Sequence, residues 1–105
     1  SRTRLNAILR HAARVDSNQK EIVTALRKRG AVVLITSQLK NAFDILVGFN
    51  GFLFIMEIKD GNKPPSAQKL TSGEIRCKEL FESVGVTYHV ITSIESALET
   101  IESAH

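Results

Sequence analysis

The chain has 105 residues, a formal net charge of +3 and a single cysteine, Cys77. This length suits one domain with one hydrophobic core, and a single cysteine excludes a disulfide within the chain. No apolar run approaches the roughly 20 residues that span a membrane, and neither CxxC nor HExxH occurs, which argues against a structural zinc site.

The charge is divided unevenly along the chain. Residues 1–29 hold eight Lys or Arg against two acids, a net charge of +6, whereas residues 30–105 hold six against nine, a net charge of −3. A basic leading segment on a near-neutral body suits a polyanion such as nucleic acid. A solvated helix face would give the same composition, so charge alone leaves both interpretations open.

The predicted elements begin with a basic helical segment within residues 1–15, ahead of a core over residues 16–104. DSNQKEIVTALRKRG predicts a helix that Asp16 or Asn18 can cap, because Asn18 and Glu21 have capping-box spacing and Gly30 is a suitable stop. The inward stripe of this helix consists of Ile22, Val23 and Leu26. The fully apolar run AVVLIT follows, and it predicts a strand that is buried on both faces.

Two more strands are predicted over FDILVGF and FLFIMEIK, with Asn50-Gly51 between them as a strong hairpin signal. A polar loop with two prolines leads to TSGE, a capping box from Thr71 to Glu74 that opens a helix ending near residue 84. The residues expected to face the core from this helix are Ile75, Leu80, Phe81 and Val84.

TYHVI predicts a fourth strand, and Ser93 caps a last helix. The core-facing residues of this helix are Ile94, Ala97, Leu98 and Ile101. The element order is therefore α-β-β-β-α-β-α, which places the chain in the α/β class.

A two-residue turn at positions 50–51 fixes the register of the flanking strands, and continuing that register places Asp44 opposite Glu57. Directly paired residues of an antiparallel ladder point to the same face, with Cβ atoms roughly 4.5–5.5 Å apart. Lys59 follows on that face, because strand side chains alternate. The sequence thus predicts two neighbouring carboxylates with a lysine beside them.

Such a carboxylate pair on apolar strands would be repulsive and poorly hydrated. A divalent cation could compensate, since hard ions prefer carboxylate oxygens. The ammonium of Lys59 alone, or a proton shared by the two acids, could also do so. The combination of acid, hairpin, apolar strand and E-x-K favours a metal-dependent site over a structural ion pair.

These residues resemble the PD-(D/E)xK nuclease superfamily and, more narrowly, the VRR-NUC domain, which is known as a small stand-alone phage protein and as part of a larger DNA-repair nuclease. The motif reads FD at Phe43-Asp44 and EIK at Glu57–Lys59. Phe43 replaces the usual proline, and Glu74 in LTSGE stands where glutamine is usual. The resemblance implies one nuclease domain with a restriction-endonuclease-like core, a central mixed sheet flanked by helices.

The resemblance also implies a metal-dependent endonuclease that leaves a 5′-phosphate and a 3′-hydroxyl. Mg²⁺ or Mn²⁺ would be held by Asp44, Glu57 and the backbone carbonyl of Ile58, and Lys59 would position or activate the attacking water. Such domains carry an acid on the first helix that completes the site, and Glu21 fits this position.

Basic residues near this site are the expected phosphate contacts. The candidates are Lys20, Lys40, Lys63 and Lys69, and beyond them Arg27, Lys28 and Arg76. Lys63 and Lys69 are preferred, because their loop directly follows Lys59. Glu74 either orients a water or a phosphate or is only the acid of a capping box.

Small relatives in the superfamily, including archaeal Holliday junction resolvases, work as homodimers, and two-fold symmetry suits a four-way junction. The resemblance therefore implies a homodimeric, structure-specific endodeoxyribonuclease acting on branched DNA, above all Holliday junctions. It would act in the cytoplasm of a bacterium or of a phage-infected host. The alternatives are a flap, nicking or general DNA nuclease, a catalytically inactive nucleic-acid-binding module, and a structural subunit.

Overall fold

The computed structural model describes residues 16–104. Its elements are α2 (Gln19–Lys28), β1 (Val32–Ile35), β2 (Ile45–Phe49), β3 (Phe52–Ile58), the 3-10 helix η1 (Pro65–Ala67), α3 (Ser72–Ser83), β4 (Tyr88–Ile91) and α4 (Ile94–Glu102). This order confirms the predicted α-β-β-β-α-β-α arrangement, while the basic segment predicted within residues 1–15 lies outside the described part. No helix within residues 16–104 has the length and apolar character needed to cross a bilayer.

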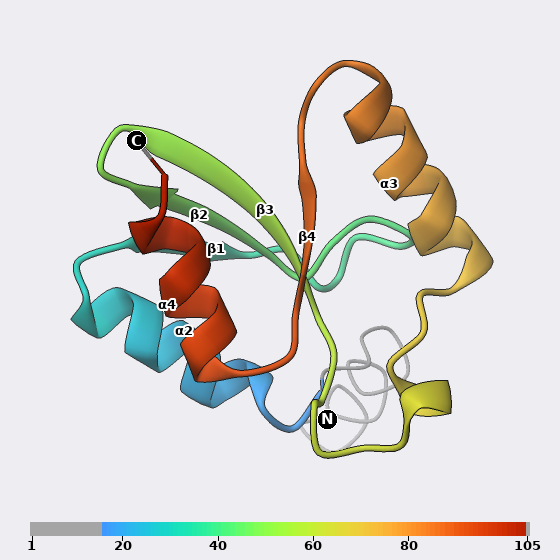
Figure 1. Cartoon of the computed structure of the whole chain (residues 1–105), viewed down its shortest axis with the longest axis horizontal. Coiled ribbons are helices and arrows are strands. Elements are labelled where there is room, and N and C mark those ends of the chain that lie inside the picture. Colours follow the sequence, from blue (N-terminus) through green and yellow to red (C-terminus); the bar gives the residue numbers. More distant parts are fainter. Residues whose placement is uncertain (1–15, 105) are drawn as a thin grey trace, which may run out of the picture.

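The four strands form one mixed sheet in the order β1-β2-β3-β4 (Figure 1). β1 pairs with β2 and β2 with β3 in antiparallel fashion, whereas β3 and β4 are parallel. A parallel pair needs a crossover between its strands, and α3 lies in that connection. Because the two strands are parallel, the C-terminal ends of β3 and β4 lie at the same end of the sheet.

The β2–β3 hairpin has the predicted register. Phe49 pairs with Phe52, and the ladder continues in this register to the first residue of β2. Asn50 and Gly51 have positive φ angles of 52° and 85°. Two successive positive φ angles characterise the type I′ turn that Asn-Gly favours, so the predicted two-residue turn is confirmed.

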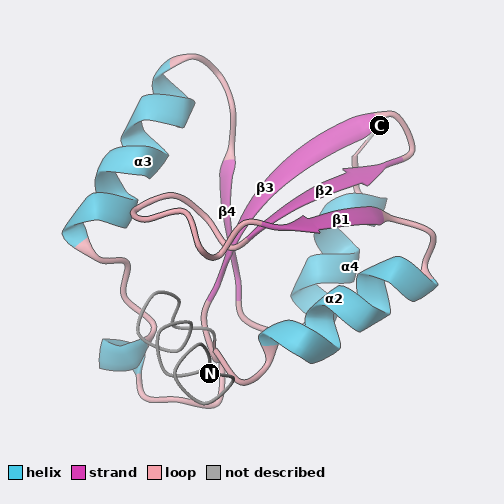
Figure 2. Ribbon diagram, turned by 180° about the vertical axis from the view of Figure 1, so that it is seen from behind, coloured by secondary structure: helices cyan, strands magenta, loops and turns pink. Residues whose placement is uncertain are grey.

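The hydrophobic core lies between one face of the sheet and the pair α2 and α4, which lie side by side (Figures 1 and 2). The predicted stripe of α2 is buried, and so are Ala97 and Ile101 of α4. The sheet contributes alternate residues of its strands, namely Val33, Ile45, Val47, Phe54, Met56, Ile58 and Ile91. The opposite face of the sheet is the one that carries Glu57, because its neighbours Met56 and Ile58 point into the core.

β1 differs from the prediction. Its apolar run was expected to be buried on both faces, but within Val32–Ile35 only Val33 is buried, while Val32, Leu34 and Ile35 are exposed. β1 is an edge strand, and α2 covers only one of its faces. The prediction was wrong because an apolar run does not reveal how many layers pack on it.

α3 differs in the same way. No residue of α3 is buried, and Leu80 and Val84 at its end are 58% and 75% exposed. The helix lies apart from α2 and α4 and packs chiefly against β4 (Figure 2). Phe81 contacts Phe43 edge to face, with ring centroids 6.1 Å apart. The prediction that this stripe of α3 faces the core was therefore wrong. The apolar residues recur with helical spacing, but no layer of the core lies opposite them.

Candidate active site

Asp44 and Glu57 meet where β2 begins and β3 ends. Asp44 directly precedes β2; its amide donates to the Met56 carbonyl at 3.0 Å, and its Oδ2 accepts from the Ile58 amide at 2.8 Å. These two hydrogen bonds extend the pairing of β2 with β3 by one residue beyond Ile45 and Met56, the last pair of the ladder. The two carboxylates consequently lie side by side, as the register predicted, and Glu57 is only 5% exposed.

Lys59 lies directly against this pair. Its Nζ is 3.5 Å from Glu57 Oε2 and 3.1 Å from Glu74 Oε1, and the residue is 9% exposed. The Lys59 amide donates to the Ile91 carbonyl, which extends the pairing of β3 with β4 beyond the end of β3. The backbone of two strands therefore holds the lysine at the carboxylates.

The electrostatics of the site follow from this burial. Burial raises the pKa of Glu57 to about 9, and a hydrogen bond with Glu74 and the charges of Asp44 and Glu74 act in the same direction. Burial likewise raises the pKa of Asp44, against the opposing hydrogen bond from the Ile58 amide. Without a cation, Glu57 is therefore protonated at neutral pH.

Lys59 and Glu74 form the charged pair of the site. Burial lowers the pKa of Lys59, but the hydrogen bond and charge of Glu74, together with Glu57, raise it above its ordinary value overall. Burial raises the pKa of Glu74, but hydrogen bonds from Glu57, the Thr71 amide and Lys59 lower it overall. Lys59 is therefore an ammonium and Glu74 a carboxylate at neutral pH.

These groups line one cavity of about 710 Å³. Its wall brings together most of the predicted site residues, namely Lys40, Asp44, Glu57, Ile58, Lys59, Lys63, Lys69 and Glu74. The other predicted phosphate contacts lie elsewhere: Lys20, Arg27 and Lys28 are on α2, and Arg76 is on the exposed side of α3. The basic residues that precede β2 or follow β3 therefore lie at the cavity, whereas those of α2 and α3 lie away from it.

Glu21 is not brought to this cavity. It is exposed in the first turn of α2 and lines other hollows with Lys20 and Glu95, because the opposite stripe of that helix faces the core. Asp16 takes the expected place, since it lines the cavity and its charge acts on Asp44. The structure therefore places Asp16, an acid that precedes the helix, at the wall of this cavity and Glu21 outside it.

Asn18 differs from its predicted role as a helix cap. The predicted capping box with Glu21 is not formed, since Asn18 makes no side-chain cap bond to α2. Its Nδ2 instead donates to the backbone carbonyls of Lys59, at 3.1 Å, and Thr92, at 3.3 Å. The side chain of Asn18 therefore links the start of α2 to the backbone directly after β3 by a hydrogen bond. This bond supports the position of Lys59.

The donors at the site suit a hard divalent cation. Among the described residues, no three or more His, Cys, Asp or Glu side chains are grouped so as to hold a metal ion. The available set is the carboxylates of Asp44 and Glu57, with Ile58 in the same cavity wall. Mg²⁺ is commonly bound by one or two carboxylates with water in its remaining positions, so these residues fit such an ion.

The arrangement was compared with known proteins. A solved structure described as "VRR_NUC domain" matches with a TM-score of 0.61 and 23% sequence identity, and the match covers 84% of this chain and 98% of that chain. A scan of protein-family models and a search of curated proteins both find no match. At this identity the likeness concerns the fold, and on that evidence the chain has the restriction-endonuclease-like fold of a VRR_NUC domain, as its motifs predicted.

Proposed function

We propose that this protein is a divalent-metal-dependent endodeoxyribonuclease that hydrolyses phosphodiester bonds in branched DNA. The observation that carries the proposal is the presence of Asp44, Glu57 and Lys59 in one cavity whose wall also holds three further lysines. Buried carboxylates favour a cation, and ammonium groups favour phosphate. The VRR_NUC fold supports the same chemistry.

Asp44 and Glu57 would hold Mg²⁺ or Mn²⁺, with the Ile58 carbonyl as a third ligand. Such a cation supplies a bound water of lowered pKa and neutralises charge that develops on the phosphate. Glu57 must give up its proton to act as a ligand. The ammonium of Lys59 would orient the attacking water or donate to a phosphate oxygen. Asp16 takes the role first given to Glu21, as a further acid at the wall of the cavity.

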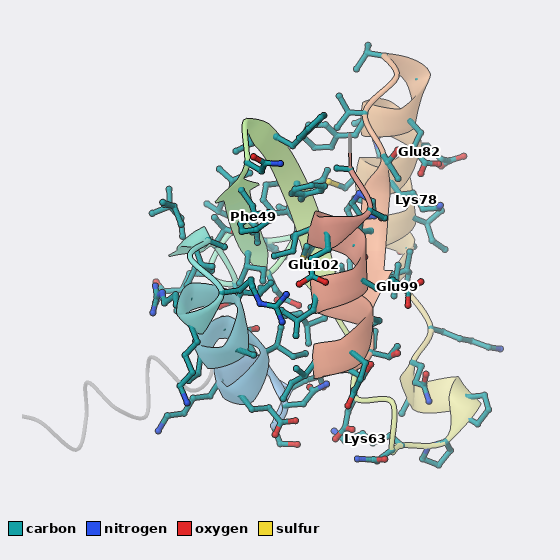
Figure 3. All side chains as sticks on the ribbon, turned by 60° about the vertical axis from the view of Figure 1, so that its left-hand side comes forward. Phe49, Lys63, Lys78, Glu82, Glu99 and Glu102 are labelled. Carbon is teal, nitrogen blue, oxygen red and sulfur yellow. The ribbon has the colours of Figure 1, made fainter. Side chains whose placement is uncertain are left out.

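The DNA backbone would be held by Lys40, Lys63 and Lys69. In the structure, Lys63 Nζ lies 3.7 Å from Asp16 Oδ1, and both side chains are partly exposed. Exposed ion pairs are weak, so a phosphate can replace Asp16 as the partner of Lys63 at little cost. Figure 3 shows Lys63 on the loop that follows β3.

We also propose a homodimer that forms through the open sheet face, which we define as Val32, Leu34, Leu53 and Val90. These side chains are exposed, with Leu53 at 71%, although they lie on strands. They share one face of the sheet, because the ladders pair Val32 with Gly48 and Gly48 with Leu53. Contiguous apolar surface of this kind is typical of interfaces, and a second copy would supply a matching surface.

This dimer would favour branched DNA. Val90 is the ladder partner of Glu57 and points to the same face, so the interface and the carboxylates share one side of the sheet. A two-fold axis through that face would place two active sites in symmetric positions. Two symmetric sites suit a four-way junction, which offers two equivalent strands for cleavage.

The proposal is tested by cleavage of labelled four-way junction, flap, duplex and single-stranded DNA with Mg²⁺ or Mn²⁺. The expected result is metal-dependent cutting with the junction cut fastest. Equal cutting of all four substrates would refute the preference for branched DNA but would still support metal-dependent hydrolysis. DNA binding without cutting would refute the nuclease and favour an inactive binding module.

A further inference from the structure

We propose that Glu74 is a positioning residue that holds the Lys59 ammonium at the carboxylate pair, so that the lysine stays in place when a cation occupies that pair. The inference rests on the proposed function, because it concerns the same active site. It also assigns a specific role to a position where the sequence left a capping acid and a phosphate contact equally open.

The distances single out Glu74 as the main partner of Lys59. The Nζ···Oε1 distance of 3.1 Å is that of a hydrogen bond, whereas the nearest Glu57 oxygen is 3.5 Å away. The side chains of Lys59 and Glu74 are 11% and 17% exposed. An ammonium has three donors, so two remain for Glu57, a water or a phosphate oxygen.

Glu74 is itself fixed by the start of α3. The Thr71 amide donates to Glu74 Oε1 at 2.9 Å, and the Glu74 amide donates to Thr71 Oγ1 at 3.2 Å, which completes a capping box. The same Oε1 therefore accepts from both Thr71 and Lys59. The carboxylate cannot swing away without breaking the cap, and it links the beginning of α3 to the end of β3.

The capping box requires a hydrogen-bond acceptor in the side chain at position 74, but it does not require a negative charge there. Glutamine closes the same box equally well. The negative charge of Glu74 is explained instead by the ammonium at 3.1 Å, because a nearly buried ammonium without an anionic partner is strongly unfavourable.

The need for this partner persists in the metal-bound site. Glu57, which is protonated without a cation, would then be ionised, but its charge would be shared with a divalent cation close to the ammonium. That cation would repel the ammonium, and the carboxylate of Glu74 offsets the repulsion. Glu74 does not join Asp44 and Glu57 as a third metal-binding side chain among the described residues, so its charge is available to the lysine.

Three variants separate the roles of Glu74. Glu74→Gln keeps the capping box and removes the charge, whereas Thr71→Val removes the side-chain half of the box and keeps the charge. Glu82→Gln is the matched control, since Glu82 also lies on α3 and pairs with a lysine, Lys78, at 3.3 Å, but both are well exposed (Figure 3).

The first measurement is nitrogen-15 NMR of the lysine side chains in the protein without metal or DNA. A hydrogen-bonded ammonium as buried as that of Lys59 should give a signal protected from solvent exchange, identified by its loss in Lys59→Met. We expect Glu74→Gln to abolish this signal, and Thr71→Val and Glu82→Gln to retain it. A wild-type protein without the signal, or a signal that persists in Glu74→Gln, would overturn the inference. This outcome does not depend on nuclease activity, so it is distinguishable from a failure of the proposed function.

The second measurement is the steady-state cleavage of DNA. Loss of groups that orient catalytic residues typically lowers activity by about 10- to 100-fold. We expect Glu74→Gln to lower kcat in this range with KM unchanged, and Glu82→Gln to match the wild type. A rise in KM with kcat intact would overturn the inference and make Glu74 a DNA contact.

Discussion

The Ile58 amide donates a hydrogen bond to Asp44 Oδ2 across 2.8 Å, and this bond joins the two strands that carry the candidate active site. It fixes the carboxylate of Asp44 next to Glu57 through the backbone and not through flexible side chains. A shift of the hairpin by one residue would turn Glu57 toward the core, so the tight turn at Asn50-Gly51 is part of the active-site architecture. The placement of the two carboxylates therefore follows from the hairpin itself.

Stability without divalent metal should fall as the pH rises from 7 to 9, above the range in which His89, whose pKa is lowered from 6.5 by burial, has the opposite effect. Burial raises the pKa of Glu57 from 4.5 to about 9 and that of Asp44 above 3.8, so the folded protein holds these protons more tightly than the unfolded chain. Their stabilising contribution is complete below the unfolded-state pKa and is lost as the pH rises through the folded-state pKa, with a limit of about 1.4 kcal/mol per pH unit for each group. Lys59, whose pKa is raised from 10.5, and Glu74, whose pKa is lowered from 4.5, act outside this window.

Thermal unfolding with a chelator present measures this effect. Tm should decrease across the window in the wild type and decrease less steeply in Glu57→Gln, which cannot titrate there. Glu99→Gln, at an exposed acid of α4 (Figure 3), is the control and should keep the wild-type slope. A slope that is the same in Glu57→Gln and the wild type would contradict the account.

Much of this arrangement could be predicted from the sequence. The Asn50-Gly51 turn sets the register by local backbone geometry, and register alone brings Asp44 to Glu57. Alternation along β3 then places Lys59, and the capping box that opens α3 is also seen. These features depend on neighbours in sequence or on one hairpin, where local rules are decisive.

The features that were missed depend on how separate elements pack. Whether β1 and α3 are covered is decided by the number of layers in the fold, which an apolar pattern does not encode. The choice between Asp16 and Glu21 depends on the direction in which α2 leaves the active site, and both are acids near the same helix start. Asn18 looked like a helix cap because Asn is a common cap, yet its side chain bonds to the chain beyond β3.

Binding of a divalent cation should release protons. At pH 7.5 Glu57 must lose the proton that its pKa of about 9 retains, so roughly one proton should leave for each ion bound. Calorimetric titration with Mg²⁺ or Mn²⁺ in buffers of different ionisation enthalpy measures this number. Asp44→Asn should abolish binding. Binding heats that are the same in every buffer would show that Glu57 is already ionised.

Asp16 and Glu21 should differ in their importance for cleavage. Asp16→Asn removes an acid from the wall of the active-site cavity and is expected to lower kcat by about tenfold. Glu21→Gln changes an exposed acid outside that cavity and should leave kcat unchanged. If the larger loss occurred in Glu21→Gln, the placement of α2 relative to the active site would be wrong.

The open sheet face should control the oligomeric state. Leu53→Asp puts a charge at the most exposed residue of the proposed interface, and light scattering after size-exclusion chromatography should show a monomer in place of the wild-type dimer. The monomer should remain folded, because Leu53 contributes little to the core. Lys28→Asp on the exposed side of α2 is the control and should stay dimeric. A monomeric wild type would refute the dimer.

The central claim is that the carboxylate pair makes this fold a metal-dependent nuclease, and Glu57→Gln tests it most directly. Without metal, glutamine mimics the protonated Glu57, so the variant should fold with a Tm at least equal to that of the wild type. The measurement is cleavage of labelled junction DNA with Mn²⁺ by the two proteins at matched concentration. We expect cleavage by the wild type, its loss on chelation, and a rate lower by about 100-fold or more in Glu57→Gln, because bound metals supply several kcal/mol to such reactions. Equal rates in the two proteins would contradict the claim.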